Sequence, residues 1–243
     1  MELPVININP VHKIHLPVLD KDIHFKPYTV EQEKLFLTAL SDNKTSEVIT
    51  NFIEILKMNI EDEIDFSNLS VIDFITIVIY IRAKSKGEVF TLEKSECSEC
   101  KKKYSFEVNF EDCIKYANED TKSKTITLTD KLAVDIQPVN FNLLYTLDND
   151  DTETSNEVKQ YNLLIDTAIY SIKKIIFNET IFNNLTYEDI KEKFINNLTE
   201  HQLKQIFDAS QDMISMNLEI NSVCPHCAKE DKTLVNNFLS LLG

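Results

Sequence analysis

The sequence predicts an α+β fold with helical bundle segments, short antiparallel strands and a zinc-ribbon-like pair of knuckles that share four cysteines. Three observations support this prediction. Apolar residues recur at helical spacing in several segments, they alternate in others, and two CxxC pairs follow alternating segments or helices. With 43% apolar and 27% charged residues in a chain of 243, the composition is that of a globular protein.

The first segment, Met1 to Lys26, is expected to be extended. Its apolar residues alternate, and three prolines interrupt any longer regular element. The alternating residues are Ile6, Ile8, Ile14, Leu16, Val18, Ile23 and Phe25.

Two helices are expected next. Thr29 and Gln32 match a capping box, and apolar residues follow at helical spacing. A second helix is predicted from about Thr45 to Lys57. Its apolar face consists of Val48, Ile49, Phe52, Ile53 and Leu56.

A third helix is expected to begin at Ser67 or Ser70 and to end near Ser85. Gly87 follows it, where a residue with positive φ commonly stops a helix. Asp73 is the one carboxylate inside this apolar segment. A buried acid needs a hydrogen-bond partner, so we expect a structural role for Asp73 rather than a catalytic one.

The pattern then changes to a strand, a turn and a strand. Residues 88–95 alternate, Cys97 and Cys100 follow, and Tyr104 to Phe110 alternate again. A CxxC turn between two strands is the layout of a zinc knuckle.

The second half is expected to repeat this order: strand, proline, helices and CxxC. The shared order indicates two similar halves, 1–118 and 119–243, which zinc would join into one compact unit. The elements expected in the second half are alternating strands at 126–136, Pro138, a surface loop at 148–157, helices at 159–177, 187–197 and 199–213, the pair Cys224 and Cys227, and an apolar tail at 234–242.

Four cysteines give the strongest chemical signal: Cys97, Cys100, Cys224 and Cys227. Two CxxC turns can direct four thiolates at one ion, and zinc prefers this tetrahedral sulfur site. The spacing between the pairs, 123 residues, exceeds that of a compact zinc ribbon, so one shared ion would join distant parts of the chain. The alternatives to a zinc site are redox or disulfide use of the cysteines, unmetallated thiols and an iron–sulfur cluster.

Several other residues are weaker candidates. Cys113 is expected to be a buried free thiol, and His226 is an alternative ligand. Arg82, the only arginine, is expected either to be solvated or snorkelling, or to bind a carboxylate in a bidentate manner. A second metal site among the N-terminal histidines is not favoured. Nearby lysines are expected to offset the charge of the sulfur site or, in the alternative, to bind nucleic acid; they are Lys94, Lys101, Lys102, Lys103, Lys229 and Lys232.

The formal net charge of −15 disfavours nucleic acid and anionic membranes as partners and favours basic proteins. The chain has only two glycines, so it cannot form the glycine-rich loops that hold nucleotide phosphates. No arrangement of residues resembles a catalytic site. We therefore expect a protein that is not an enzyme and that has no small-molecule substrate.

No secretory signal pattern is visible in Met1 to Pro10, and the longest apolar stretch, Leu69 to Ile81, is shorter than the ~20 residues of a membrane span. These patterns predict a cytoplasmic protein. A reducing compartment favours metal ligands or free thiols over disulfides.

Several stretches of the sequence resemble one protein family. These are FKPYTVEQEKL from Phe25 to Leu35, Asp73 within the third helix, IRAKSKG from Ile81 to Gly87 before the first CxxC, and the second CxxC near the end. In this order they are similar to the T4-type bacteriophage baseplate proteins, in particular the baseplate hub assembly proteins of contractile-tailed phages. The resemblance extends over most of the chain, although each motif is short.

The resemblance implies a non-enzymatic protein that assembles the tail baseplate hub, as a chaperone-like factor, or that is a minor hub component. Its partners would be other baseplate or tail hub proteins, and its location the host cytoplasm during assembly or the tail of the virion. The two cysteine pairs carry over as metal ligands, and Arg82 and Gly87 as structural residues near the first knuckle. The alternative is a nucleic-acid-associated zinc-ribbon factor, such as a transcription accessory protein.

Overall fold

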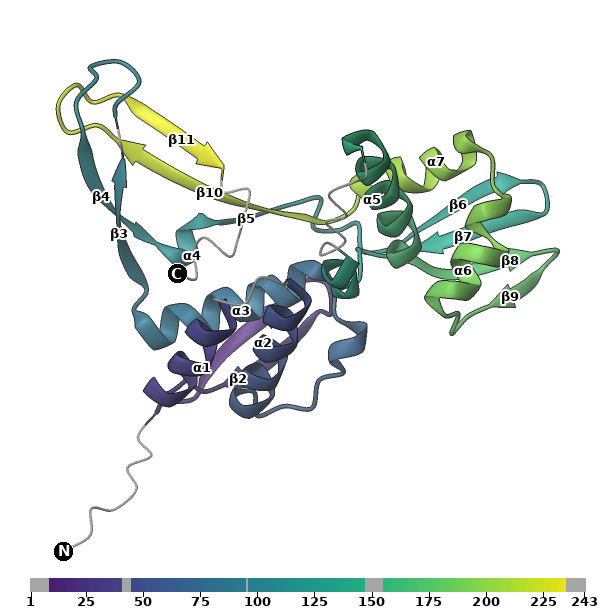
Figure 1. Cartoon of the computed structure of the whole chain (residues 1–243), viewed down its shortest axis with the longest axis horizontal. Helices are drawn as coiled ribbons and strands as arrows, with labels where there is room; N and C mark the ends of the chain where they lie inside the picture. Colours follow the sequence, from purple (N-terminus) through teal and green to yellow (C-terminus); the bar gives the residue numbers. More distant parts are fainter. Residues whose placement is uncertain (1–8, 41–44, 95, 147–154, 235–243) are drawn as a thin grey trace, which may run out of the picture.

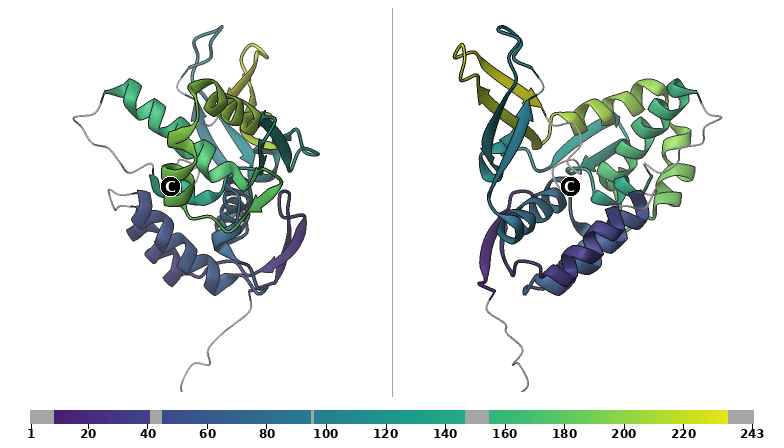
Figure 2. Two further views of the ribbon diagram at one scale, coloured as in Figure 1. Left: turned by 90° about the vertical axis from the view of Figure 1, so that its right-hand side faces the viewer. Right: turned by 60° about the vertical axis from the view of Figure 1, so that its left-hand side comes forward.

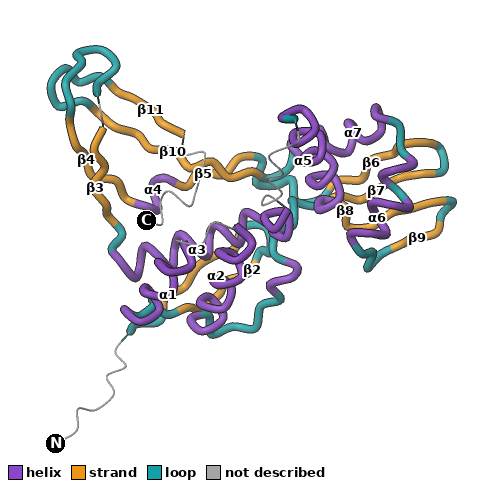
Figure 3. Tube along the Cα trace, viewed as in Figure 1, coloured by secondary structure: helices purple, strands orange, loops and turns teal. Residues whose placement is uncertain are grey.

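The computed structural model of the chain describes residues 9–40, 45–94, 96–146 and 155–234 (Figure 1). Helices and short antiparallel sheets alternate along the chain, which confirms the predicted α+β class. They form an N-terminal group, a C-terminal group and an arm of two hairpins that extends away from both (Figures 1 and 3).

The N-terminal group contains one hairpin and a set of helices. Strands β1 (His12–Leu16) and β2 (Lys21–Phe25) pair in antiparallel register. The helices are α1 (Val30–Leu40), α2 (Thr45–Asn59), α3 (Val71–Lys86) and the short 3₁₀ turns η1 (Phe66–Asn68) and η2 (Phe141–Thr146).

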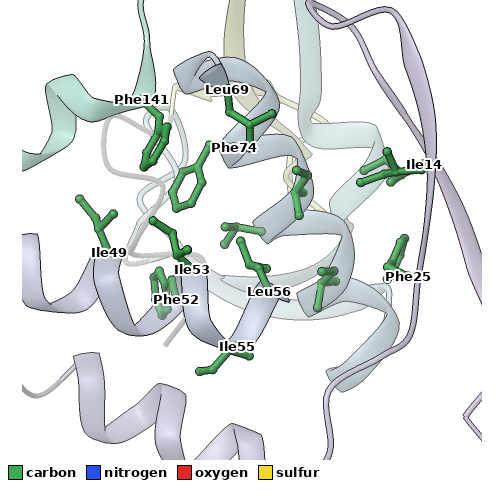
Figure 4. Close-up of a cluster of buried hydrophobic side chains, with 14 of the residues drawn as sticks. Ile14, Phe25, Ile49, Phe52, Ile53, Ile55, Leu56, Leu69, Phe74 and Phe141 are labelled. Carbon is green, nitrogen blue, oxygen red and sulfur yellow. The ribbon is translucent and has the colours of Figure 1, made fainter. Parts of the chain in front are cut away.

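Alternation in the hairpin and helical periodicity in α2 place apolar side chains on one shared core (Figure 4). All five residues of the predicted α2 face are buried. The rings of Phe74 and Phe141 stack with their centroids 5.1 Å apart, so η2 from the middle of the chain covers the N-terminal core.

The predicted helix signals lie at the expected positions. The Thr29 N–H donates to Gln32 Oε1 at 2.8 Å, and the Gln32 N–H donates to Thr29 Oγ1 at 3.4 Å, as in a capping box. Ser70, the second of the two candidate caps, accepts from the Asp73 N–H. Gly87 ends α3 with φ 120°.

We expect Gly87→Ala to lower the free energy of unfolding by about 1–2 kcal/mol. A Cβ at this position would meet only the Val89 carbonyl oxygen, at 3.9 Å, so the cost arises from the positive φ and not from a clash. Urea denaturation of the two proteins measures the difference, and equal midpoints would contradict this explanation.

The arm joins two sequence regions. Its first part contains β3 (Val89–Lys94), β4 (Tyr104–Asn109), the single turn α4 (Phe110–Cys113) and β5 (Ile114–Ala117). Its second part contains β10 (Ser215–Val223) and β11 (Glu230–Leu234). The hairpins β3–β4 and β10–β11 lie next to each other in all views (Figures 1 and 2).

Strand β10 connects the arm to the rest of the fold. Its first residues, 215–218, pair with β5, and residues 219–223 pair with β11 on the other edge. The prediction of a strand through Phe110 is wrong at its last residue. The Asn109 side chain accepts from the Glu111 N–H, which caps a helical turn and ends β4.

The C-terminal group has a four-stranded sheet in the order β6-β7-β8-β9. Its strands are β6 (Lys124–Thr129), β7 (Leu132–Ile136), β8 (Ile172–Phe177) and β9 (Thr180–Phe182). Its helices are α5 (Asn156–Ser171), α6 (Tyr187–Lys193), α7 (Glu200–Gln211) and the 3₁₀ turn η3 (Ile195–Asn197). These elements share a second core.

The prediction of one helix over 159–177 is wrong in its last third, because α5 ends at Ser171 and β8 follows at once. The sequence of β8, IKKIIF, contains three isoleucines that suit a pleated surface, and β8 pairs with both β7 and β9. Tertiary pairing therefore overrides the helical periodicity of this segment.

The order hairpin, proline, helices and CxxC does occur twice, but β8 and β9 have no counterpart in the first half. The expected alternation at Ile6 and Ile8, most of the loop at 148–157 and the tail beyond Leu234 lie outside the described residues. In the described part of the chain, no helix has the length and apolar character needed to cross a membrane.

Candidate metal centre

The four predicted cysteines meet at the end of the arm, which confirms that they converge. Their Sγ atoms all lie within 4.8 Å of one another. Two distances between the pairs are shorter: Cys97 Sγ to Cys227 Sγ and Cys100 Sγ to Cys224 Sγ are both 3.7 Å. Tetrahedral zinc with bonds of about 2.3 Å would place sulfurs about 3.8 Å apart, so the sulfur positions fit this ion.

The two CxxC turns have the same backbone geometry. In the first, the Cys97 N–H donates to the Lys102 carbonyl at 3.0 Å and the Lys101 N–H donates to the Cys97 carbonyl at 3.1 Å. In the second, the equivalent bonds join Cys224 with residues 229 and 228, at 2.8 and 2.9 Å. Both turns therefore have the backbone geometry of a metal-binding knuckle, and each lies between two paired strands.

Each knuckle contains one residue with positive φ, Lys101 at 61° and Ala228 at 58°. Glycine adopts this conformation at lower cost than alanine or lysine, so Ala228→Gly should raise the free energy of unfolding by about 1 kcal/mol. Calorimetry of the metal-loaded protein measures the change. A lower melting temperature than that of the unsubstituted protein would contradict it.

The thiols differ strongly in proton affinity. The N–H groups of Cys100 and Glu99 point at Cys97 Sγ and lower the pKa of Cys97 to about 7. The Lys229 N–H acts in the same direction on Cys227, but desolvation and the other three sulfurs outweigh it and raise the pKa of Cys227 to about 12. Four thiolates in such proximity need a cation to offset their charge, and a divalent ion that prefers sulfur could supply it.

Few contacts other than the sulfurs hold the end of the arm together. Its small core contains Cys97, Cys224 and Tyr104, with Cys100 and Phe106 packed against it. The hydroxyls of Tyr104 and Ser222 hydrogen-bond at 3.0 Å between β4 and β10. A second small core, formed by Val108, Cys113 and Ile220, joins β4 to β10 nearer the base of the arm. The tip itself buries little apolar surface, and small domains use a metal in such places.

The geometry disfavours redox use of the cysteines. None of the five cysteines forms a disulfide bond, and two sulfur contacts of 3.7 Å join different CxxC pairs. Both pairs lie in turns between strands, whereas a redox CxxC opens a helix after a strand.

Acidic residues neutralise part of the lysine charge near the knuckles. Lys101 Nζ lies 3.7 Å from Glu96, and Lys232 Nζ lies 2.7 Å from Glu219. Ser98 Oγ donates to the Asp231 carboxylate at 3.2 Å, which links the first knuckle to β11. A surface on which lysines and acidic residues are mixed in this way binds the phosphates of nucleic acids poorly.

The structure places the weaker candidates elsewhere. His226 is exposed and lies outside the sulfur cluster, and Cys113 is buried, as predicted. The expectation that Arg82 is solvated is wrong: it is 8% exposed, and its Cζ lies 5.4 Å from the ring centroid of Phe110, so it joins α3 to α4. Within the described ranges, the four cysteines are the only group of three or more metal-binding side chains, so the N-terminal histidines form no such site.

Asp73 has the structural role that was predicted. It is fully buried, and its two carboxylate oxygens accept from the N–H groups of Val18 and Leu19 at 3.0 and 3.1 Å. Burial raises the pKa of Asp73, although these hydrogen bonds oppose the change. The carboxylate thus fixes the turn between β1 and β2 to the start of α3.

Comparison with known proteins gives one match. Residues 9–243 match the model of a protein family described as "T4 bacteriophage base plate protein". This range contains the described part of the fold and both knuckles. No curated protein and no solved structure matches the chain.

Proposed function

Because the chain belongs to the family of T4 bacteriophage base plate proteins, we propose that it is a non-enzymatic protein of the tail base plate hub. It acts in hub assembly as a chaperone-like factor, or it is a minor hub component. It contains one structural zinc ion, bound by Cys97, Cys100, Cys224 and Cys227. The family match over nearly the whole described chain is the observation that carries this proposal.

The zinc ion has a structural function in this proposal. It joins the halves 1–118 and 119–243, each of which contributes one knuckle. The four sulfurs would occupy every position of a tetrahedral ion and leave none for a substrate or an activated water. A closed site of this kind orders the fold and performs no chemistry.

Other base plate or tail hub proteins are the proposed partners, in the host cytoplasm during assembly or in the virion tail. The acidic chain suits a basic protein surface. Nucleic acid, membranes and small-molecule substrates are not proposed as partners.

Affinity purification of the tagged protein from phage-infected cells tests this function. We expect other tail or base plate proteins to co-purify with it at physiological salt. The alternative, a nucleic-acid-associated zinc-ribbon factor, predicts instead DNA or RNA binding that weakens steeply as salt increases. Nucleic-acid binding without tail proteins would refute the hub function and favour this alternative.

A further inference from the structure

An open, apolar edge of the C-terminal sheet is not explained by the metal centre. Strand β9 is an outer strand of the sheet, and β8 is its only strand partner within the residues that the structure describes (Figure 1). Three apolar side chains at this edge are strongly exposed: Phe177 at 47%, Ile181 at 56% and Phe182 at 43%. An apolar edge strand is an aggregation hazard unless another chain covers it.

A groove lies beneath this edge. Register pairs Leu132 with Phe177 and Ile175 with Phe182, so these four residues lie toward the same face of the sheet. They line a groove of about 650 Å³ together with Phe194 and Leu198 from the helical side. The sheet therefore extends beyond the helices that cover it, and the core remains open there.

The main chain of β9 offers a defined hydrogen-bonding position. A two-residue turn, Asn178–Glu179, joins β8 to β9, with positive φ at both residues. In such a hairpin the residues that flank the turn, Phe177 and Thr180, exchange hydrogen bonds with each other. The alternation of the ladder then directs the N–H and C=O of Ile181 outward, toward the open edge.

We propose that this edge is a dimer interface, in which β9 pairs antiparallel with β9 of a second copy of the chain. A two-fold axis beside Ile181 would let the two Ile181 residues exchange both main-chain hydrogen bonds. The Phe182 rings of the two copies lie on the same face, and each closes the open groove of the other copy.

The edge segment carries little of the acidic charge that opposes association of two copies. Two chains of net charge −15 repel each other over most of their surfaces. The segment 172–182 has only Lys173, Lys174 and Glu179 as charged residues, so acidic repulsion between two copies is weaker there than over the rest of the surface. Interface centres are likewise depleted in charge and enriched in aromatic residues.

Sedimentation equilibrium of the full-length protein over a concentration series tests the proposal. We expect the mass to rise from 28.1 kDa to twice that value. Ile181→Lys should lower the association constant by about tenfold or more, because two like charges would meet at the axis. At a concentration where both proteins are monomers, its melting temperature should not change, because the side chain is exposed.

Val158→Lys is the matched control, since Val158 is 48% exposed on α5, away from β9. This variant should dimerise like the unsubstituted protein. A mass of 28.1 kDa at every concentration would overturn the proposal. Equal association of the two lysine variants would also overturn it, as would a monomer that uses Ile181 to bind a different base plate protein.

Discussion

Replacing Cys224 with serine is expected to lower the free energy of unfolding by about 4 kcal/mol or more and to release the metal. Cys224 is buried, and its Sγ lies 3.7 Å from Cys100 Sγ, so the substitution removes one of the four clustered sulfurs. Without the ion, the small core at the tip holds the two CxxC turns together only weakly, although Val108 and Ile220 still join the hairpins nearer the base of the arm. The arm should then open from its tip while both larger cores remain folded.

Hydrogen exchange, detected by mass spectrometry, measures the loss of stability in each segment of the Cys224→Ser protein. Urea denaturation measures the loss for the whole protein. Fast exchange should be confined to the arm, in residues 89–109 and 215–234. Cys113→Ala is the matched control, because Cys113 is equally buried but lies outside the sulfur cluster. It should retain the metal and cost only about 1–2 kcal/mol. A Cys224→Ser protein that is as stable as the Cys113→Ala protein would contradict the structural role of the ion.

Replacing Asp73 with alanine is expected to cost about 3 kcal/mol. The change leaves the buried N–H groups of Val18 and Leu19 without an acceptor and frees the β1–β2 turn from α3. Urea denaturation measures the loss. The control is Asp65→Ala, because Asp65 also accepts hydrogen bonds from neighbouring residues but is exposed, so its removal should cost about 1 kcal/mol or less. Equal losses in the two variants would contradict the argument from burial.

The pH dependence of stability provides a second test of Asp73. Burial raises its pKa in the folded protein above the ordinary value of 3.8. Between these two pKa values the folded state binds more protons than the unfolded state, so the contribution of Asp73 to stability falls as pH rises through this window. Asp73→Asn does not titrate. Its free energy of unfolding is expected to be lower than that of the unsubstituted protein, and this difference should grow as pH falls from neutral toward 3.8. A difference that shrinks over this range would contradict a raised pKa of Asp73.

Local signals made the N-terminal helices and the first knuckle predictable. The capping box at Thr29, the periodic face of α2 and the strand–CxxC–strand pattern depend on residues close in sequence, and short segments contain them completely. The role of Asp73 was predictable for a related reason, because a lone carboxylate in an apolar helix needs a buried partner.

Features that depend on distant parts of the chain were not predictable. Strand β8 appeared helical because its apolar residues continue the periodicity of α5, and only its pairing with β7 and β9 fixes it as a strand. Strands β10 and β11 contain many polar residues, and their pairing follows from the position of β5 and of the second knuckle. The stacking of Arg82 on Phe110 depends on how α3 meets α4, which no local pattern encodes.

Native mass spectrometry of the full-length protein, purified without chelator, tests the central claim most directly. We predict that the 28.1-kDa chain binds one zinc ion, and that acid or a strong chelator removes it together with the protection of four thiols from alkylation. A chain that contains no metal and whose four clustered thiols all react at the rate of free cysteine would contradict the claim that these sulfurs bind one ion.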